Sequence, residues 1–331
     1  MPDILIGERA RKLYGEALVW DDHSGFDPEG GAHRLEHLQR WAKSGVHYLS
    51  VNVGYDVIPW RSTLRNLAAF RAWLQQRPDQ YLLVKTADDI PQARREGKLA
   101  VTFDLEGMNA LDGDVNMVNV YYALGVRQML FAYNLNNLAG GGCHDADMGL
   151  TDFGRAVIDE MNRVGMLVDC SHTGHRTTME AMAASAAPVI FSHSCAKVLW
   201  EHGRNITDEQ IKACAATGGV IGINGIGNFL GENDISSATF VDHLAHMADL
   251  VGAAHVGIAL DYAFDAETVE DLVSGNSEYW PEAEYRTASH YLPPEQLPEI
   301  VETMLRRGFS DAEVTGILGG NFLRVAKAVW K

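Results

Sequence analysis

The feature that most constrains the fold is a short apolar run that recurs eight times along the chain. The runs are rich in Val, Ile, Leu and aromatic residues, and each has the length of a buried strand. They are ALVWDDH (17–23), HYLSVNV (47–53), LAVTFDLEG (99–107), QMLFAYN (128–134), MLVDCSH (166–172), PVIFSHS (188–194), GVIGING (219–225) and HVGIALDY (255–262). Strands separated by longer polar segments predict a parallel sheet covered by helices.

The segments between these runs have the spacing of amphipathic helices. They include RLEHLQRWAKSG (34–45), TLRNLAAFRAWLQQ (63–76), DFGRAVIDEMNRVG (152–165), HRTTMEAMAAS (175–185), TDEQIKACAATGG (207–219) and FVDHLAHMADLVG (240–252). Several end in Gly, the usual helix stop before a strand. Eight alternations favour a closed (β/α)₈ TIM barrel over an open doubly wound sheet. No GxGxxG or GxxxxGK[ST] follows a run, so the fingerprint of a nucleotide-binding sheet is missing.

The chain reads as one domain, because no low-complexity or Pro/Ser-rich linker divides residues 1–331. A helical extension from about Pro293 to Trp330 is expected to pack outside the barrel. The acidic, aromatic insertion around 268–292 is expected to lie over its mouth.

Charge and composition exclude several classes of partner. The formal charge of −17 repels phosphate backbones and anionic lipid surfaces, so nucleic acid and membrane are not expected as partners. No basic-then-apolar leader and no stretch of membrane-span length are apparent, which predicts a cytoplasmic protein. The four cysteines are scattered without a CxxC pair, so we expect reduced thiols rather than disulfides or a cysteine zinc site.

Polar side chains end five of the eight runs. They are Asp21, Asp22 and His23 in the first, Asp104 and Glu106 in the third, Asp169 and His172 in the fifth, His193 in the sixth and Asp261 in the eighth. In a TIM barrel these ends meet at the mouth that carries the active site. Three imidazoles with one or two carboxylates predict a divalent-metal site, with zinc preferred. The remaining histidines of helical or loop patterns are interpreted as surface or structural: His33, His37, His144, His175, His202, His243, His246 and His290.

This pattern predicts a hydrolase. A water bound to such a metal has a pKa of about 7, so hydroxide is available at neutral pH to attack an amide carbonyl. A carboxylate nearby can accept the proton of the water and return it to the leaving amine. Asp261 is the candidate for this task.

Longer motifs give the chain a family resemblance. LVWDDHSGF, FDLEG, GLTDFGRAVIDEMNRVGMLVDCSH, PVIFSHSCAK, HGRNITDEQIKACAATGGVIGIN, HVGIALDY and GGNFLRV resemble segments of the membrane (renal) dipeptidase family of metallopeptidases, within the amidohydrolase-like barrels. The similarity covers most of the chain. It implies a zinc-dependent dipeptidase and, as a family expectation, a homodimer.

The resemblance also implies roles for individual residues. His23 and Glu106 would bind one metal, and Glu106, His172 and His193 a second, with Glu106 bridging the two ions. Asp261 matches the family's acid/base residue. Arg204 matches the residue that binds the substrate carboxylate, a task suited to a planar two-pronged donor.

Three positions depart from the family pattern. Gly25 stands where the family has a metal-binding Asp, so the chain is expected to hold one or two zinc ions, with Asp22 and Asp27 as nearby substitutes. Tyr133 replaces a substrate-polarising histidine and can still donate a hydrogen bond to an oxyanion. Ile226 replaces a pocket tyrosine. Two alternatives stay open: a mononuclear amidohydrolase acting on a non-peptide amide or ring, and a catalytically impaired relative that binds a small molecule.

Overall fold

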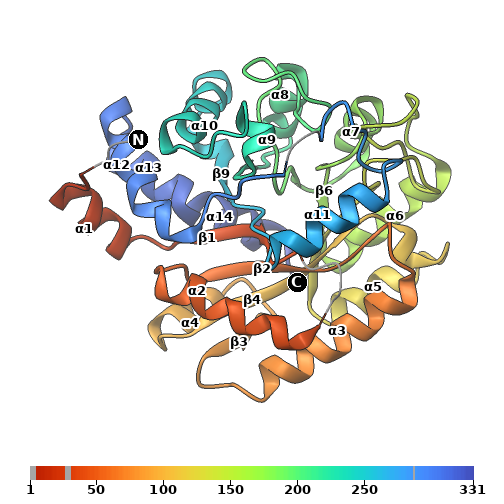
Figure 1. Cartoon of the computed structure of the whole chain (residues 1–331). Coiled ribbons are helices and arrows are strands. Elements are labelled where there is room, and N and C mark those ends of the chain that lie inside the picture. The colour runs from red at the N-terminus through yellow and green to blue at the C-terminus, as the bar shows by residue number, and fades with distance from the viewer. Residues whose placement is uncertain (1–4, 27–30, 286–287) are drawn as a thin grey trace.

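The computed structural model describes residues 5–26, 31–285 and 288–331, which form an α/β barrel (Figure 1). The sheet order is β1-β2-β4-β5-β6-β7, and β8 pairs with β9. All of these pairings are parallel. The strands are β1 Trp20–Ser24, β2 Tyr48–Tyr55, β4 Leu99–Glu106, β5 Val126–Leu130, β6 Leu167–Asp169, β7 Val189–Ile190, β8 Ile221–Asn224 and β9 Val256–Ala259. Each of the eight apolar runs overlaps one of them.

Two further junctions join these pieces into a ring. Phe191, just after β7, forms a parallel bridge with Ile221 at the start of β8. Between β9 and β1, the Asp261 amide donates to the His23 carbonyl at 2.8 Å, and the Gly25 amide donates to the Tyr262 carbonyl at 2.9 Å. The sheet therefore closes on itself, and the predicted (β/α)₈ architecture is confirmed.

One strand was not predicted. Tyr81–Leu83 forms β3, which pairs in parallel with the start of β4 and lies off the path of the barrel. It is three residues long and no polar side chain ends it, so it lacks the feature that marks five of the eight predicted runs.

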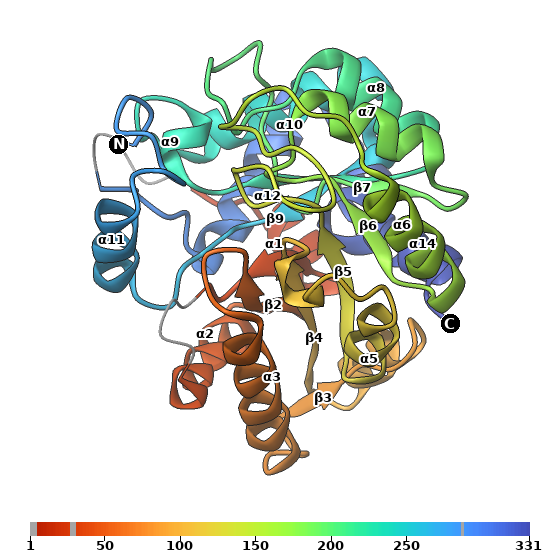
Figure 2. The ribbon, with the colours of Figure 1, turned by 90° about the vertical axis from the view of Figure 1, so that its right-hand side faces the viewer.

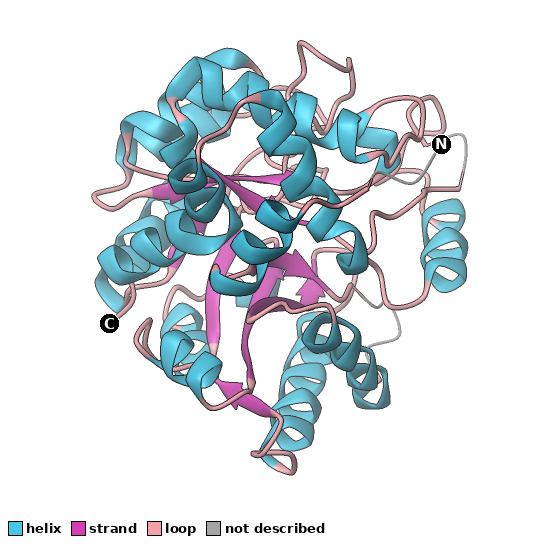
Figure 3. Cartoon of the chain, turned by 90° about the vertical axis from the view of Figure 1, so that its left-hand side faces the viewer, coloured by secondary structure: helices cyan, strands magenta, loops and turns pink. Residues whose placement is uncertain are grey.

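The helices lie outside the strands, as Figures 2 and 3 show. They are α1 Glu8–Glu16, α2 Leu38–Lys43, α3 Trp60–Gln75, α4 Asp89–Arg95, α5 Met117–Ala123, α6 Asp152–Val164, α7 His175–Ala184, α8 Asp208–Ala216, α9 Gly227–Leu230, α10 Ser237–Val251, α11 Ala266–Gly275, α12 Leu297–Arg307, α13 Asp311–Thr315 and α14 Asn321–Val329. The predicted helix over 34–45 is split into a 3₁₀ turn, Ala32–His37, and α2. Within the described ranges, every helix is too short or too polar to span a bilayer.

Helix ends follow the local sequence. The Thr207 side chain accepts a hydrogen bond from the Gln210 backbone amide, and the Gln210 side chain accepts one from the Thr207 backbone amide. The two residues thus form a capping box at the first turn of α8. Gly165 ends α6 in the left-handed conformation, as expected from a glycine at this position.

The C-terminal extension covers the N-terminal end of the barrel. Phe322 of α14 stacks on Trp20 at the start of β1, with 5.9 Å between the ring centroids. Gly257 in β9 makes room for it, since a Cβ there would lie 2.3 Å from the Phe322 ring. This end of the barrel is consequently filled by apolar side chains, and the opposite end is free to carry polar groups.

Candidate metal centre

Four of the predicted residues converge at the C-terminal mouth of the barrel. Glu106 ends β4, and His23 lies in β1. His172 and His193 follow β6 and β7 in the loops beyond them. The Nε2 atoms of His172, His193 and His23 lie 3.1, 3.3 and 3.6 Å from Glu106 Oε1. The structure thus gathers side chains from four strands around one carboxylate oxygen.

Each imidazole is held through Nδ1 by a buried acceptor. The three pairs are His23 with Asp104 Oδ1 (3.2 Å), His172 with Asn134 Oδ1 (2.7 Å) and His193 with Ser192 Oγ (2.7 Å). The Ser192 hydroxyl donates onward to Asp169, so its oxygen is available as an acceptor. This network favours the tautomer with the proton on Nδ1, which leaves the Nε2 lone pair for a metal.

Burial sets the charge of the cluster. It lowers the pKa of His172 and of His193 well below the usual range, so both rings stay neutral as ligands must. Burial also raises the pKa of Glu106 well above its usual range, and the nearby Asp261 carboxylate adds to the rise. For His23 burial opposes protonation, but Asp104 and Glu106 outweigh it and raise its pKa. A cation among these carboxylates would relieve their mutual repulsion.

The residues present fit a divalent ion. Ligand atoms of His23, Glu106 and His193 all lie within 4.8 Å of one another. Nε2 of His23 is buried without a hydrogen-bond partner within the described residues. Imidazole nitrogen with carboxylate oxygen is a donor set that zinc takes in catalytic sites.

Asp261 and Tyr133 border this cluster, as predicted. Oδ1 of Asp261 lies 3.5 Å from His23 Nε2, while its Oδ2 accepts a hydrogen bond from Asn224 at 2.8 Å. The Tyr133 ring stacks on His172 with 4.2 Å between centroids. Its backbone amide donates to Asp56 Oδ2 at 3.1 Å, which fixes the loop.

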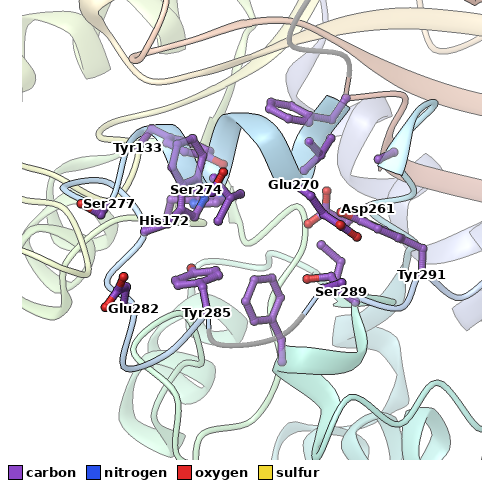
Figure 4. Close-up of a pocket in the computed structure, with 18 of the residues that line it drawn as sticks. Tyr133, His172, Asp261, Glu270, Ser274, Ser277, Glu282, Tyr285, Ser289 and Tyr291 are labelled. Carbon is purple, nitrogen blue, oxygen red and sulfur yellow. The ribbon is translucent and has the colours of Figure 1, made fainter. Parts of the chain in front are cut away.

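A cavity of about 830 Å³ opens above the cluster (Figure 4). Tyr133 and His172 lie on one side of it, and Asp261 and Glu270 on the other. The lining residues described are Phe26, Glu106, Tyr133, His172, Ile226, Phe229, Asp261, Ala263, Val269, Glu270, Val273, Ser274, Ser277, Trp280, Glu282, Ala283, Tyr285, Ala288, Ser289 and Tyr291. Helix α11 and the residues after it supply much of this wall, so the insertion predicted around 268–292 does lie over the mouth.

Arg204 lies apart from the cavity lining. It is buried, its Nη2 donates to the His193 carbonyl at 3.0 Å, and its guanidinium lies 5.3 Å from the centroid of the Phe229 ring. Phe229 itself lines the cavity, whereas Arg204 is not among the described lining residues. Its role as a carboxylate ligand stays a prediction.

Of the two expected substitutes for the missing aspartate, Asp22 can be placed, and it does not join the cluster. Asp22 Oδ1 accepts a hydrogen bond from the Trp20 indole at 2.7 Å, and its Oδ2 is buried without a partner within the described residues. Asp27 lies outside the described residues.

Sequence reasoning missed several residues that shape the site. Asn52 donates to Asp104 Oδ1 and to Glu106 Oε2, both at 3.1 Å. Its position as a polar residue inside the second apolar run was an available signal. His144 and His202, interpreted as surface or structural, contact the loop of the cavity wall, where His144 Nε2 lies 3.0 Å from the Tyr285 hydroxyl.

Comparisons with known proteins agree with this arrangement. The model of the membrane dipeptidase family, peptidase family M19, matches residues 45–276. An uncharacterized dipeptidase of Schizosaccharomyces pombe is 32% identical over 279 residues, which cover 81% of this chain and 62% of the relative. Dipeptidase verJ of Clonostachys rogersoniana is 30% identical over 272 residues, which cover 81% of this chain and 65% of that relative. The chain therefore spans less than two thirds of the length of either relative.

Solved structures give the same fold. An amidohydrolase from Pseudomonas aeruginosa superposes with a TM-score of 0.87 at 26% identity, covering 97% of this chain and 99% of that one. A metallopeptidase from Rhodobacter sphaeroides, liganded with a phosphinate mimic of the dipeptide L-Ala-D-Ala, superposes with a TM-score of 0.78 at 18% identity, covering 95% and 99%.

Proposed function

Since the chain belongs to the membrane dipeptidase family, peptidase family M19, we propose that it is a zinc-dependent hydrolase of dipeptides or dipeptide-like amides. The observation that carries this proposal is the convergence of three imidazole Nε2 atoms on Glu106 Oε1 at the floor of a large cavity. Asp261 lies at the same floor, within reach of a proton on a bound reactant.

These residues would hold a divalent ion, which would lower the pKa of a coordinated water to about 7 and polarise the carbonyl of the substrate. Asp261 accepts a proton from the attacking water and delivers it to the leaving amine. Asn224 holds Oδ2 of this carboxylate, which directs Oδ1 towards the cluster. The Tyr133 hydroxyl donates to the carbonyl oxygen as negative charge develops on it. The aromatic walls exclude water from the reacting groups.

The cavity favours substrates with bulky apolar groups. Its volume of about 830 Å³ lies towards the upper end of the roughly 300–1,000 Å³ typical of small-molecule pockets. Aromatic side chains from several elements line it, namely Phe26, Tyr133, Phe229, Trp280, Tyr285 and Tyr291.

The test is a turnover panel on protein purified without chelator. Dipeptides with two small side chains are compared with dipeptides that carry aromatic or long aliphatic ones, each as free acid and as C-terminal carboxamide. We expect turnover, with kcat/KM higher for the bulky members. The variant His172→Ala is expected to lose activity and bound metal together, whereas His175→Ala, an exposed residue of α7, keeps both. Full activity in His172→Ala, or no turnover by metal-loaded protein, would contradict the proposal.

The same cavity favours one second candidate, a hydrolase of non-peptide amides. The aromatic side chains that line it would also receive the aromatic group of a non-peptide amide. Aromatic N-acyl amines without a carboxylate, added to the panel, distinguish the two. Turnover restricted to these compounds would establish the second candidate in place of the first.

A further inference from the structure

We propose that this chain holds a single divalent ion, at Glu106 Oε1, His172 and His193, and that Gly25 with Phe264 and Asn52 closes the position of a second ion. This inference rests on the proposed metal-dependent function and departs from the two bridged ions that the family resemblance implies. Three features of the site support it independently of one another.

The first feature is the number of lone pairs. Two groups of three ligands can be drawn, one with His172 and one with His23, and both contain Glu106 and His193. An imidazole nitrogen has one lone pair and therefore binds one ion. Because His193 can serve only one of the two groups, an ion beside His23 would need a further ligand in place of His193 once the group with His172 is filled.

The positions of the imidazoles select the group that contains His172. The Nε2 atoms of His172 and His193 lie 2.9 Å apart, and each is within 3.3 Å of Glu106 Oε1. Two nitrogens at about 2.0–2.1 Å from a tetrahedral zinc ion lie roughly 3.3 Å apart, so a small adjustment accommodates an ion here. His23 is farther from that oxygen, at 3.6 Å, and its ring stacks on His193 instead.

The second feature is the steric closure at Gly25. Its φ of +81° is in the left-handed region that favours glycine. A Cβ at this position would lie 2.7 Å from the Phe264 ring, closer than real Cβ atoms approach. Phe264 is buried, with its ring packed against Trp41 at 5.8 Å between centroids. Residue 25 can therefore not supply a ligand for a second ion beside His23 in this conformation.

The third feature is the hydrogen bond to the other oxygen of the carboxylate. A carboxylate that bridges two ions commonly offers one oxygen to each. Here Oε2 of Glu106 accepts a hydrogen bond from the buried amide of Asn52 at 3.1 Å. Asn52 is fixed in turn because the same nitrogen lies 3.1 Å from Asp104 Oδ1. Glu106 accordingly presents Oε1 alone to the imidazoles.

The test counts ions in folded protein without substrate. Metal content is measured by mass spectrometry, and the electron paramagnetic resonance spectrum of Mn²⁺-loaded protein is recorded. We expect one ion per chain and a single-ion spectrum without exchange coupling. His172→Ala should lower the bound metal at least tenfold, whereas His23→Ala should retain it within twofold. Two ions in the unaltered chain, or equal losses in the two variants, would overturn the inference.

The closure at Gly25 is tested by adding the missing carboxylate. Gly25→Asp is expected to lower Tm and still hold one ion, and a second ion in this variant would refute the closure. If Gly25→Asp does not fold, the double variant Gly25→Asp with Phe264→Ala removes the overlap with the aromatic ring, and the number of ions per chain is measured in that variant. In that double variant we expect uptake of more than one ion, and an unchanged count would show that Phe264 is not what closes the position.

The count also separates this inference from the proposed function. Two ions with turnover would overturn the single-ion site and leave the hydrolase intact. One ion per chain without turnover of any amide would overturn the proposed hydrolase function and leave the single-ion site intact. Absence of metal from protein that stays apo in excess zinc would overturn both.

Discussion

The two ends of the barrel are built from the same strands and differ completely in chemistry. At the N-terminal end, Trp20 stacks on Tyr48 with 3.6 Å between centroids, and Phe322 and Trp330 pack over the pair. Three residues beyond Trp20, the same strand places His23 in the metal cluster. The chain thus passes from mainly aromatic packing at Trp20 to the buried ionisable group of His23 within three residues.

The difference shows where this fold accumulates unfavourable energy. Five described non-glycine residues have positive φ, and Asn134, His172 and Asp261 are three of them, all at the mouth. Buried acids at this end are also costly, since burial raises the pKa of Asp21 and of Asp56 to about 6. Strained conformations and buried charges persist when the rest of the structure determines them. The packing at the apolar end supplies the stability that offsets these costs. We therefore expect substitutions at the apolar end to lower stability and substitutions at the mouth to lower activity.

The largest expected effect is a loss of kcat, without unfolding, when Asp261 at the mouth is replaced. Asp261→Asn keeps the side-chain volume and one oxygen for Asn224, but removes the group that moves the proton. We expect kcat to fall by about 10²–10⁴-fold, with bound metal unchanged and Tm within a few degrees. The checks are steady-state kinetics, metal content and thermal unfolding.

The matched control is Asp265→Asn on the same loop, where the carboxylate pairs with Arg34 at 2.6 Å and caps α11. Its kcat should stay within about threefold of the unaltered protein. Equal losses in Asp261→Asn and Asp265→Asn would mean that loop structure, rather than proton transfer, accounts for the effect.

The next largest effect is a loss of stability, without a change in kcat, when Phe322 at the N-terminal end is replaced. Phe322→Ala opens a cavity against Trp20 and should lower the free energy of unfolding by about 3–5 kcal/mol. In the folded fraction, kcat and metal content should be unchanged, because Phe322 lies at the far end of the barrel. Denaturant unfolding followed by kinetics at low temperature measures both. Leu323→Ala, a partly buried neighbour on α14, should cost less.

A milder variant guards against loss of folding. Phe322→Leu retains most of the apolar volume and should cost about 1–2 kcal/mol. A fall in kcat in this variant, at a temperature where it is fully folded, would mean that the two ends are coupled.

The barrel itself could be predicted from sequence because its signal is local and repeated. Each strand is an apolar run, and each functional strand ends in a polar side chain, so His23, Glu106 and Asp261 are visible as departures from the pattern. His172 and His193 end two further runs in the same way. All five meet at one mouth because parallel strands bring their carboxyl ends to the same edge.

What could not be predicted depends on contacts between distant segments. Asn52 is visible in the sequence only as a polar residue inside an apolar run, and its role depends on the register that places it opposite Asp104 and within reach of Glu106. The restriction at Gly25 requires knowledge of Phe264, more than two hundred residues away in the chain. Arg204 was identified by motif alone, and it is not among the described residues that line the cavity.

The smallest expected effect tests whether the apolar end has a pH dependence of its own. His47, just before β2, accepts a hydrogen bond from the Val19 amide at 3.1 Å. Burial, with the positive charge of Arg94, lowers the pKa of His47 to about 4 from its ordinary 6.5. The unfolded chain therefore takes up this proton first, so stability is complete above pH 6.5 and is lost as the pH falls towards 4. Because His47 is only half-buried, we expect a loss of about 1 kcal/mol, or roughly 2–4 °C in Tm.

The variant His47→Asn isolates this contribution, since its amide oxygen can replace Nδ1 as acceptor without titrating near pH 5. The Tm difference between unaltered protein and variant is measured from pH 7 to pH 4, at saturating zinc. Because the histidines of the metal cluster are common to both proteins, their titration cancels in the difference. The unaltered chain should lose more stability than the variant across this range. His175→Asn, at an exposed position, should give parallel curves. If His47→Asn is also parallel to the unaltered chain, the acid sensitivity belongs to the mouth alone, and the contrast between the two ends becomes sharper still.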